Sequence, residues 1–344
     1  MAFWDEPIQP SELTGFVREM PAPANWTLNE VLPDVAVRDF EAVVRKLTKT
    51  NRAAKFRAYD AETPIGKRDS IAEQRVQLPP LGQKTVVAEE ERIRLEQARL
   101  GGDGTQALID AVYDDAEVNA RAVHARMELA RGDVLTDGKV TITENGIVGL
   151  EADYGLAGGH LVAPGTLWST VATATPLADL LSWRQTYIND AGEPPGKILT
   201  SSAVIANLLR NAEIRQIAGS VLGTPSIVSR AALDQVLTAH GLPMIVEYDA
   251  QIDVDGSTTR PIAADRLIML PADPRSLGYT AWGITAEALD LAGGDNPELL
   301  FEDAPGLVGV VMREGDPVRT WTKVTAVGLP IIEDASKLLV ADVQ

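Results

Sequence analysis

The sequence contains no cysteine and has few histidine and aromatic residues. Of its 344 residues, 3 are histidine and 5% are aromatic. The absence of cysteine excludes disulfide bonds, thiolate nucleophiles and zinc sites built from thiolates. Hydrophobic residues make up 45% of the chain, so a core is feasible but must pack mainly through small aliphatic side chains. The length fits either two lobes or one elongated architecture.

Long hydrophobic runs and excess positive charge are also missing. No apolar stretch is long enough to span a bilayer, and the N-terminal MAFWDEPIQP lacks the basic and apolar parts of a signal peptide. We therefore expect synthesis in the cytoplasm and no membrane partner. The net charge of -18 and the pI of about 4.6 argue against a basic face that grips nucleic acid. A wall that surrounds nucleic acid without adhering to it would benefit from such acidity, as would simple solubility.

A narrow apolar stripe predicts a long amphipathic helix that begins near Thr105 and ends at Gly132. The stripe residues lie three or four positions apart, on one helical face: Ile109, Val112, Ala116, Ala120, Val123, Met127 and Ala130. The opposite side, which includes Glu128, should meet water or a neighbour. Turn dipeptides at Asp137-Gly138 and Asn145-Gly146 then predict a hairpin over 134–147.

The chain before this helix favours extended structure. Residues 1–34 are rich in proline, which predicts an arm ordered by lying on its own body or on another subunit. The spacing of apolar residues in 35–47 predicts a short helix. Residues 56–93 have little core of their own, and such a stretch is functional, disordered or a projecting arm. We favour a projecting two-stranded arm, with a surface helix in the charged run 89–99.

The second half of the chain predicts an α+β lobe over about 170–305. Three helices are expected, with Thr175 and Ser229 as N-caps: 176–189, 201–211 and 229–239. Strand signals follow at 244–249, 251–254, 266–270 and 306–313. The extended tail 321–343 and the long helix each have a single apolar face to bury, so we expect these two elements to pack together.

Candidate metal ligands are scattered along the chain. His124, His160 and His240 form no ligand pattern, so surface or core roles are favoured over metal binding. Part of a calcium loop is suggested by Asp249, Asp253, Asp255 and Gly256. An EF-hand in this register would need acids at Gln251 and Ile262. A hairpin turn is therefore the favoured interpretation.

Motifs for nucleotide binding and nucleophilic catalysis are absent. The glycines near Gly158 do not follow a GxGxxG spacing, and no Gly-Lys pair is followed by Ser or Thr. Ser201 and Ser202 lie outside a GxSxG elbow and predict a helix cap. Arg131-Gly132-Asp133 spells an adhesion tripeptide, although the end of a helix is the favoured interpretation there.

Paired carboxylates could in principle serve acid–base chemistry at Asp114, Asp115 and Glu117. A solvated or subunit-facing side of the helix is the favoured interpretation. We therefore predict no catalytic, cofactor-binding or metal-binding residues. The absence of a convergent set points to a structural or interaction protein, with a catalytic set dispersed across the fold as the alternative.

Four segments follow one another in an order that is typical of a known family. They are FRAYDAETPIGKRDS with the following Pro79-Pro80-Leu81-Gly82, VNARAVHARMELARGDVLTDGKVTI, ADRLIMLPADPRSLGYTAWG, and VTAVGLPIIEDASKLLVADV. Together they resemble the major capsid protein E family of tailed phages, which includes the lambda capsid protein. Residues 165–260 match that family only in style.

The resemblance implies an α+β fold of the Hong Kong 97-like capsid type. Its expected parts are an N-terminal arm (1–50), an extended E-loop with its flanks (51–100), a P-domain with a long spine helix and strands (101–165), an A-domain (166–309) and a C-terminal return to the P-domain (310–344). Some shells of this fold cross-link Lys to Asn. Lys67 and Lys84 lie in the expected loop, where a solubilising role is favoured.

The resemblance also implies a function and a set of partners. The protein would be the structural major capsid protein of a tailed double-stranded DNA bacteriophage, located in the virion and made in the host cytoplasm. Copies would form hexamers and pentamers of an icosahedral shell around the genome. Scaffold, portal and decoration proteins would be partners, with DNA contacted non-specifically at most. The alternatives are an encapsulin-like cellular shell of the same fold and an acidic cytosolic enzyme with a dispersed site.

Overall fold

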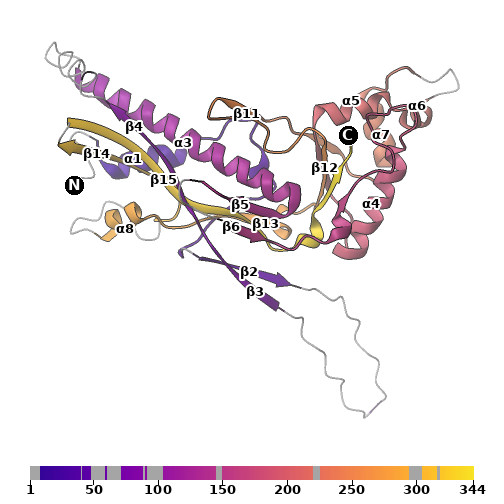
Figure 1. The fold of residues 1–344 in the computed structure, drawn as a ribbon, viewed down its shortest axis with the longest axis horizontal. Coiled ribbons are helices and arrows are strands. Elements are labelled where there is room, and N and C mark those ends of the chain that lie inside the picture. The colour runs from indigo at the N-terminus through magenta and orange to yellow at the C-terminus, as the bar shows by residue number, and fades with distance from the viewer. Residues whose placement is uncertain are drawn as a thin grey trace.

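The longest element of the computed structural model is the helix α3 (Gly104–Asp137), which has 34 residues and runs along the body of the protein (Figure 1). The predicted helix is confirmed, but its predicted end at Gly132 is wrong. Gly132 is buried within the helix, and a Cβ built on it would lie 2.1 Å from the carbonyl oxygen of Pro261. Glycine is needed there for close approach. The helix ends before Gly138, whose φ of 73° is left-handed.

The structure describes residues 8–39, 41–47, 59, 71–87, 90, 104–144, 149–219, 225–293, 304–315 and 318–344. Three sequence predictions therefore fall wholly or mostly outside the described residues: the surface helix at 89–99, the Asn145-Gly146 turn and the role of Lys67. Within the described ranges, no helix combines the length and the apolar character needed to cross a membrane.

A five-stranded sheet lies against α3. Its order is β1-β13-β15-β14, and β4 also pairs with β15. The strands are β1 (Asp34–Ala36), β4 (Pro80–Val87), β13 (Gly278–Trp282), β14 (Val308–Gly315) and β15 (Val318–Ile332). The buried amide of Asn119 on α3 donates to the Thr322 carbonyl oxygen at 3.0 Å and to Thr85 Oγ1 at 3.1 Å. The expected packing of the tail against the helix is thus confirmed for β15.

The predicted apolar seam of α3 lies in the core of this body. Val112, Ala116, Ala120, Val123 and Met127 are at most 2% exposed, and they pack with Val324 and Ala326 of β15. Ile109 and Ala130 are partly buried at the same contact. The three-and-four spacing therefore identified the buried face, since side chains at these intervals share one side of a helix.

The N-terminal arm contains a helix that the sequence analysis missed. α1 (Pro10–Glu19) has proline at its first position, where the missing N–H costs nothing. Leu13 and Val17 are fully buried against the core of the body. Thr14 Oγ1 donates to the carbonyl oxygen of Gly309 at 3.1 Å, which fixes α1 on β14. The proline content was therefore a poor argument for a wholly extended arm.

The helix predicted over 35–47 is wrong, because this segment forms two strands. β1 pairs in parallel with β13, and β2 (Glu41–Leu47) pairs antiparallel with β3 (Ile71–Gln77). β-Branched valines favour strands, and pairing with distant segments overrides a local helical spacing. The β2–β3 ribbon extends below the body in Figure 1, but only β3 lies within 56–93, where a two-stranded arm was predicted. Its base is anchored where the buried Ala42 lies opposite the buried Val76.

The strand predicted after α3 is confirmed, but residues 134–137 of the predicted hairpin belong to α3 and the partner strand lies beyond residue 147. β5 (Lys139–Ile142) pairs antiparallel with β6 (Leu150–Asp153). The body also carries the helix α8 (Ala286–Gly293), which the sequence analysis missed. Short 3-10 turns connect the elements: η1 (Leu28–Glu30), η2 (Gly158–His160), η3 (Pro274–Ser276) and η5 (Ala335–Lys337).

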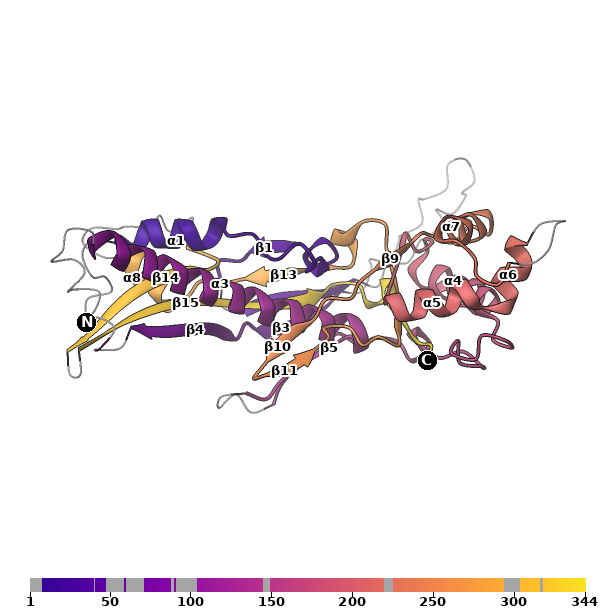
Figure 2. The same cartoon turned by 90° about the horizontal axis from the view of Figure 1, so that it is seen from above.

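A second lobe lies at one end of the elongated molecule (Figure 2). Its sheet has the order β7-β16-β12-β8-β9, and the strands are β7 (Leu161–Val162), β8 (Lys197–Thr200), β9 (Ile245–Glu247), β12 (Arg266–Leu270) and β16 (Leu339–Asp342). The last strand therefore lies in the lobe, whereas β15 lies in the body. A separate hairpin is formed by β10 (Ile252–Val254) and β11 (Ser257–Thr259).

Helices build the rest of the described part of the lobe. They are α4 (Pro176–Ala191), α5 (Ser202–Arg210), α6 (Ala212–Ala218) and α7 (Arg230–Ala239). Three were predicted, and α6 was missed. Ser201 and Ser229 cap α5 and α7 by accepting from the backbone N–H three residues later. Thr175 was predicted as a cap but makes no side-chain cap bond, and α4 begins instead on Pro176.

Substitution of Gly132 should test the close approach of Pro261. We expect Gly132→Ala to lower the free energy of unfolding by about 1–3 kcal/mol, because the added Cβ meets backbone atoms that cannot rotate away. Gly15→Ala in α1 is the matched control, since nothing lies within 4 Å of its Cβ. Alanine there should stabilise by about 0.5–1 kcal/mol. Urea denaturation checks both, and a stabilising Gly132→Ala would contradict the packing argument.

Candidate functional site: a buried polar network and the surfaces around it

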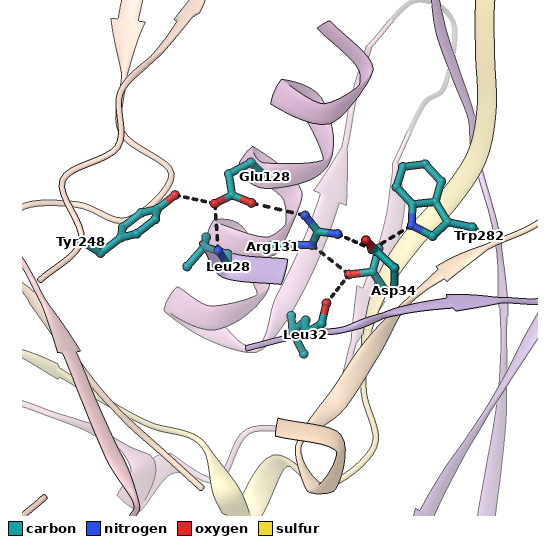
Figure 3. A network of polar contacts seen from close by, with 8 residues as sticks. Leu28, Leu32, Asp34, Glu128, Arg131, Tyr248 and Trp282 are labelled. Atoms are coloured by element: carbon teal, nitrogen blue, oxygen red, sulfur yellow. Dashed lines mark hydrogen bonds and ion pairs between the residues drawn. The ribbon is translucent and has the colours of Figure 1, made fainter. Parts of the chain in front are cut away.

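A buried polar network joins α3 to η1, β1, β13 and the segment after β9 (Figure 3). Glu128 is 1% exposed, so its predicted place on the water-facing side of the helix is wrong. Its Oε1 accepts from the backbone N–H of Leu28 at 3.0 Å and from the hydroxyl of Tyr248 at 2.9 Å. Its Oε2 accepts from Arg131 at 3.3 Å. The carboxylate therefore holds η1 and the segment after β9 against the helix.

Arg131 extends the network to the N-terminal strand and the central sheet. Its Nη2 donates to Asp34 Oδ1 at 2.5 Å, and its Nε donates to Thr280 Oγ1 at 2.9 Å. The Thr280 hydroxyl in turn donates to the carbonyl oxygen of Leu32 at 2.9 Å. The Trp282 indole donates to Asp34 Oδ1 at 2.8 Å. Arg131 is 4% exposed, so the Arg-Gly-Asp tripeptide is not displayed as an adhesion motif would be.

The electrostatics of this network suit a fixed joint. A buried carboxylate is costly unless it is paired and hydrogen-bonded, and the guanidinium of Arg131 with the two donors meets that need for Glu128. Burial, and then the charge and hydrogen bond of Glu128, raise the pKa of the Tyr248 hydroxyl. A tyrosine held neutral beside a paired carboxylate holds position rather than moving protons. The i, i+3 spacing of Glu128 and Arg131 is the sequence signal from which this ion pair could have been predicted.

The three histidines lie apart in the structure. His124 is half-buried on α3, where burial and then Arg131 lower its pKa against the opposing effect of Asp34. His160 is fully buried, with Nδ1 2.7 Å from the Leu338 carbonyl oxygen and Nε2 2.8 Å from Asp190 Oδ2. His240 ends α7, with Nδ1 2.8 Å from the carbonyl oxygen of Val236. Across the described residues, no group of His, Asp and Glu could hold a metal ion.

The residues that suggested a calcium loop serve a hairpin turn and a helix cap. Asp253 accepts from the N–H of Gly256 at 2.7 Å, at the predicted turn of the β10–β11 hairpin. Asp249 instead caps α5 by accepting from Ser202 N at 2.9 Å, and it pairs with Arg260 at 2.6 Å. Burial would raise the pKa of Asp249, but the bonds from Ser202 and Arg260 hold it below its ordinary value.

The acidic residues of α3 lie at its surface. Asp114 is exposed, and Glu117 accepts from Arg121 one turn later at 2.8 Å. This is an exposed i, i+4 pair of the kind that stabilises a helix slightly. The proposed cap at Ser201 also has a structural role, because its hydroxyl donates to the carbonyl oxygen of Ala264 and accepts from Val204 N. Glu117 and Ser201 therefore both make ordinary structural contacts.

A groove of about 480 Å³ lies between β4, β15 and the start of α8. Glu287 of α8 forms an ion pair with Lys323 and also accepts from Thr325 Oγ1 at 3.3 Å. Burial would raise the pKa of Glu287, but the hydrogen bond and charge of Lys323 lower it. Lys84 lines the same groove, with its ammonium 4.2 Å from the centre of the Trp321 ring. The groove thus presents two lysines and one carboxylate.

The fold is that of phage capsid proteins in solved structures. A structure described as a prophage capsid protein from Escherichia coli CFT073 is 16% identical, with 98% of this chain and 99% of that chain covered and a TM-score of 0.63. A phage-related protein from Bordetella bronchiseptica RB50 is 11% identical, with 99% and 98% covered and a TM-score of 0.52. The predicted α+β fold of the Hong Kong 97-like capsid type is confirmed.

The sequence gives the family. Residues 9–343 match the model of the family Phage major capsid protein E, and the chain belongs to this family. The resemblance drawn from the sequence motifs is therefore confirmed, and with it the function of a phage major capsid protein. Comparison with curated proteins gives no match.

Removal of the Arg131 guanidinium should reveal how much the network contributes. Arg131→Met leaves Glu128 buried without its cation, so we expect a loss of about 3–5 kcal/mol in the free energy of unfolding. Arg121→Met, which removes an exposed pair on the same helix, should cost at most about 0.5 kcal/mol. Chemical denaturation of both variants measures the difference, and equal losses would show that burial of the pair has no consequence.

The raised pKa of Tyr248 predicts alkaline destabilisation. The unfolded chain ionises this hydroxyl near pH 10, whereas the folded protein keeps it neutral. The free energy of unfolding is therefore unaffected by ionisation of this group below about pH 10. It falls as the pH rises further, by up to about 1.4 kcal/mol per pH unit. Burial likewise raises the pKa of Tyr154 and Tyr187. Tyr248→Phe should reduce the slope of unfolding free energy between pH 10 and 11.5, and an unchanged slope would contradict the assignment.

Proposed function

We propose that copies of this chain assemble into the hexamers and pentamers of an icosahedral shell that encloses the double-stranded DNA of a tailed phage. The observation that carries the proposal is the β2–β3 ribbon, which projects from a body of the family fold (Figure 1). Such shells place the protein in the virion after synthesis in the host cytoplasm. The family match favours a phage shell over a cellular one.

The ribbon supports assembly because two strands cannot stabilise themselves. An isolated two-stranded hairpin is at best marginally stable in water. Burial at Ala42 and Val76 secures the base, and the pairing runs on to Leu47 and Ile71, away from the core. A neighbouring copy offers the surface on which such a ribbon can lie. Each subunit would then extend over the next one, which links subunits around a ring.

The five parts expected from the family give each region a role. We assign 1–50 to the N-terminal arm, 51–100 to the E-loop, 101–165 to the P-domain, 166–309 to the A-domain and 310–344 to the C-terminal return. The lobe with α4 to α7 falls in the assigned A-domain. Two strands pair with a strand of another part. β13, from the range assigned to the A-domain, pairs with β15 in the body, and β16, from the C-terminal return, pairs with β12 in the lobe. These strands would transmit force between the two domains.

The partners follow from the same assignment. A shell of this kind would associate with scaffold, portal and decoration proteins, and would touch DNA non-specifically at most. A net charge of -18 suits a wall that encloses DNA without adhering to it. We infer a structural protein without enzymatic activity, because the candidate residues His160, Asp249 and Ser201 already serve capping and packing contacts.

Shortening the ribbon should separate folding from assembly. Replacing residues 51–68 by a short Gly-Ser turn keeps β2, β3 and the buried base, so we expect a folded subunit with nearly unchanged unfolding free energy that cannot close shells. Sedimentation velocity and electron microscopy provide the measurement. The control is a variant in which the same Gly-Ser residues are inserted after the exposed Gly256, and this variant should still assemble. Normal shells from the shortened ribbon, or no large particles from the unmodified chain, would refute the proposal.

A further inference from the structure

The strand β4 has an open edge in the described part of the chain. Its one described partner is β15, in the register Pro80 opposite Val327 through Val87 opposite Thr320. The N–H of Gly328 donates to the Pro79 carbonyl oxygen at 3.2 Å, which makes Pro80 opposite Val327 a non-hydrogen-bonded pair. The alternation of an antiparallel ladder then directs the backbone groups of Leu81, Gln83, Thr85 and Val87 toward β15.

The remaining residues of β4 direct their backbone groups to the other side. Gly82, Lys84 and Val86 each present an N–H and a carbonyl oxygen along the open edge. Val86 is also 40% exposed. An unpaired edge of this length is a template for a strand from another chain. At the lobe's edge strand β9, by contrast, the guanidinium of Arg230 donates to the Ile245 carbonyl oxygen and so covers part of the edge.

Lys84 places a positive charge beside this edge. Lys84 lies directly opposite Lys323 in the register, so both side chains lie on one face of the sheet. Glu287 neutralises Lys323. The Lys84 ammonium rests over Trp321, and no carboxylate in the described ranges pairs with it. The remaining positive charge of Lys84 favours an added carboxylate, in a chain whose net charge is -18.

We propose that an extended, carboxylate-bearing segment of a second copy of this chain pairs with the open edge of β4 and places a carboxylate against Lys84. The inference rests on the proposed shell, in which every copy presents the same edge to a neighbour. The chain carries 49 acidic and 31 basic residues, so a second copy offers an excess of the complementary charge. Backbone pairing supplies the affinity, and Lys84 selects the acidic segment.

Hydrogen exchange of the full-length protein tests the strand pairing directly. In free subunits the N–H groups of Lys84 and Val86 should exchange rapidly, while those of Gln83 and Thr85 are protected by β15. Assembly should slow exchange at Lys84 and Val86 by at least about tenfold. Unchanged exchange at both amides in assembled particles would overturn the proposal.

Two substitutions test the same edge by assembly yield. Val86→Pro removes an outward N–H that β15 does not use, so the subunit should fold but lose most of its particles. Val86→Thr keeps the N–H and should assemble normally. Lys84→Glu should also prevent assembly, whereas Lys84→Arg should preserve it. Arg210→Glu, at an exposed cation of α5, controls for a change in net charge.

The outcomes separate this proposal from the shell itself. Circular dichroism and thermal unfolding establish that each variant is folded before particles are counted. If the purified unmodified chain forms particles and either Val86→Pro or Lys84→Glu forms them equally well, the β4 edge is not the contact, although the shell assignment stands. If the unmodified chain forms no large particles, the shell assignment fails. Loss in both variants, with normal particles from the three controls, supports a second copy as the occupant.

Discussion

The buried Glu128–Arg131 pair is the interaction on which the arrangement of the body depends. Its partners come from η1, β1, β13 and the segment after β9, which are far apart in the sequence. Each partner removes part of the cost of burying a carboxylate and a guanidinium, and the loss of any one leaves a polar group without its bond. The pair therefore selects one arrangement of these segments, even where apolar replacements of the same volume would be equally stable.

This joint also explains how an elongated subunit keeps its shape. α3 lies along β15 and β4, and Asn119 bonds to both strands near the middle of the helix. Glu128, Arg131 and Gly132 fix its C-terminal part, where the helix meets the lobe through Tyr248 and Pro261. A helix held at several points along its length resists bending. The ribbon and the open edge of β4 can then face neighbours in a defined geometry.

The sequence predicted the elements whose signals are local. The α3 seam, the caps at Ser201 and Ser229 and the turn at Gly256 depend on residues within a few positions of one another. The errors arose where a distant segment decides the structure. Residues 35–47 became strands through β13 and β3, and Gly132 is a glycine because Pro261 approaches the helix there, not because the helix ends. Glu128 lies outside the apolar seam, and only partners about one hundred residues away make it a buried residue.

Assembly of such an acidic chain requires that local attraction and global repulsion act at different ranges. Each copy carries a net charge of -18, so approaching copies repel through solvent over about one Debye length, roughly 8 Å at physiological ionic strength. Added salt screens this repulsion and favours encounter. A carboxylate placed against Lys84 beside a paired strand is partly desolvated and therefore less screened. Shell formation should thus be limited mainly at low salt, because salt screens the repulsion between copies more than it weakens a short, partly desolvated contact such as that at Lys84.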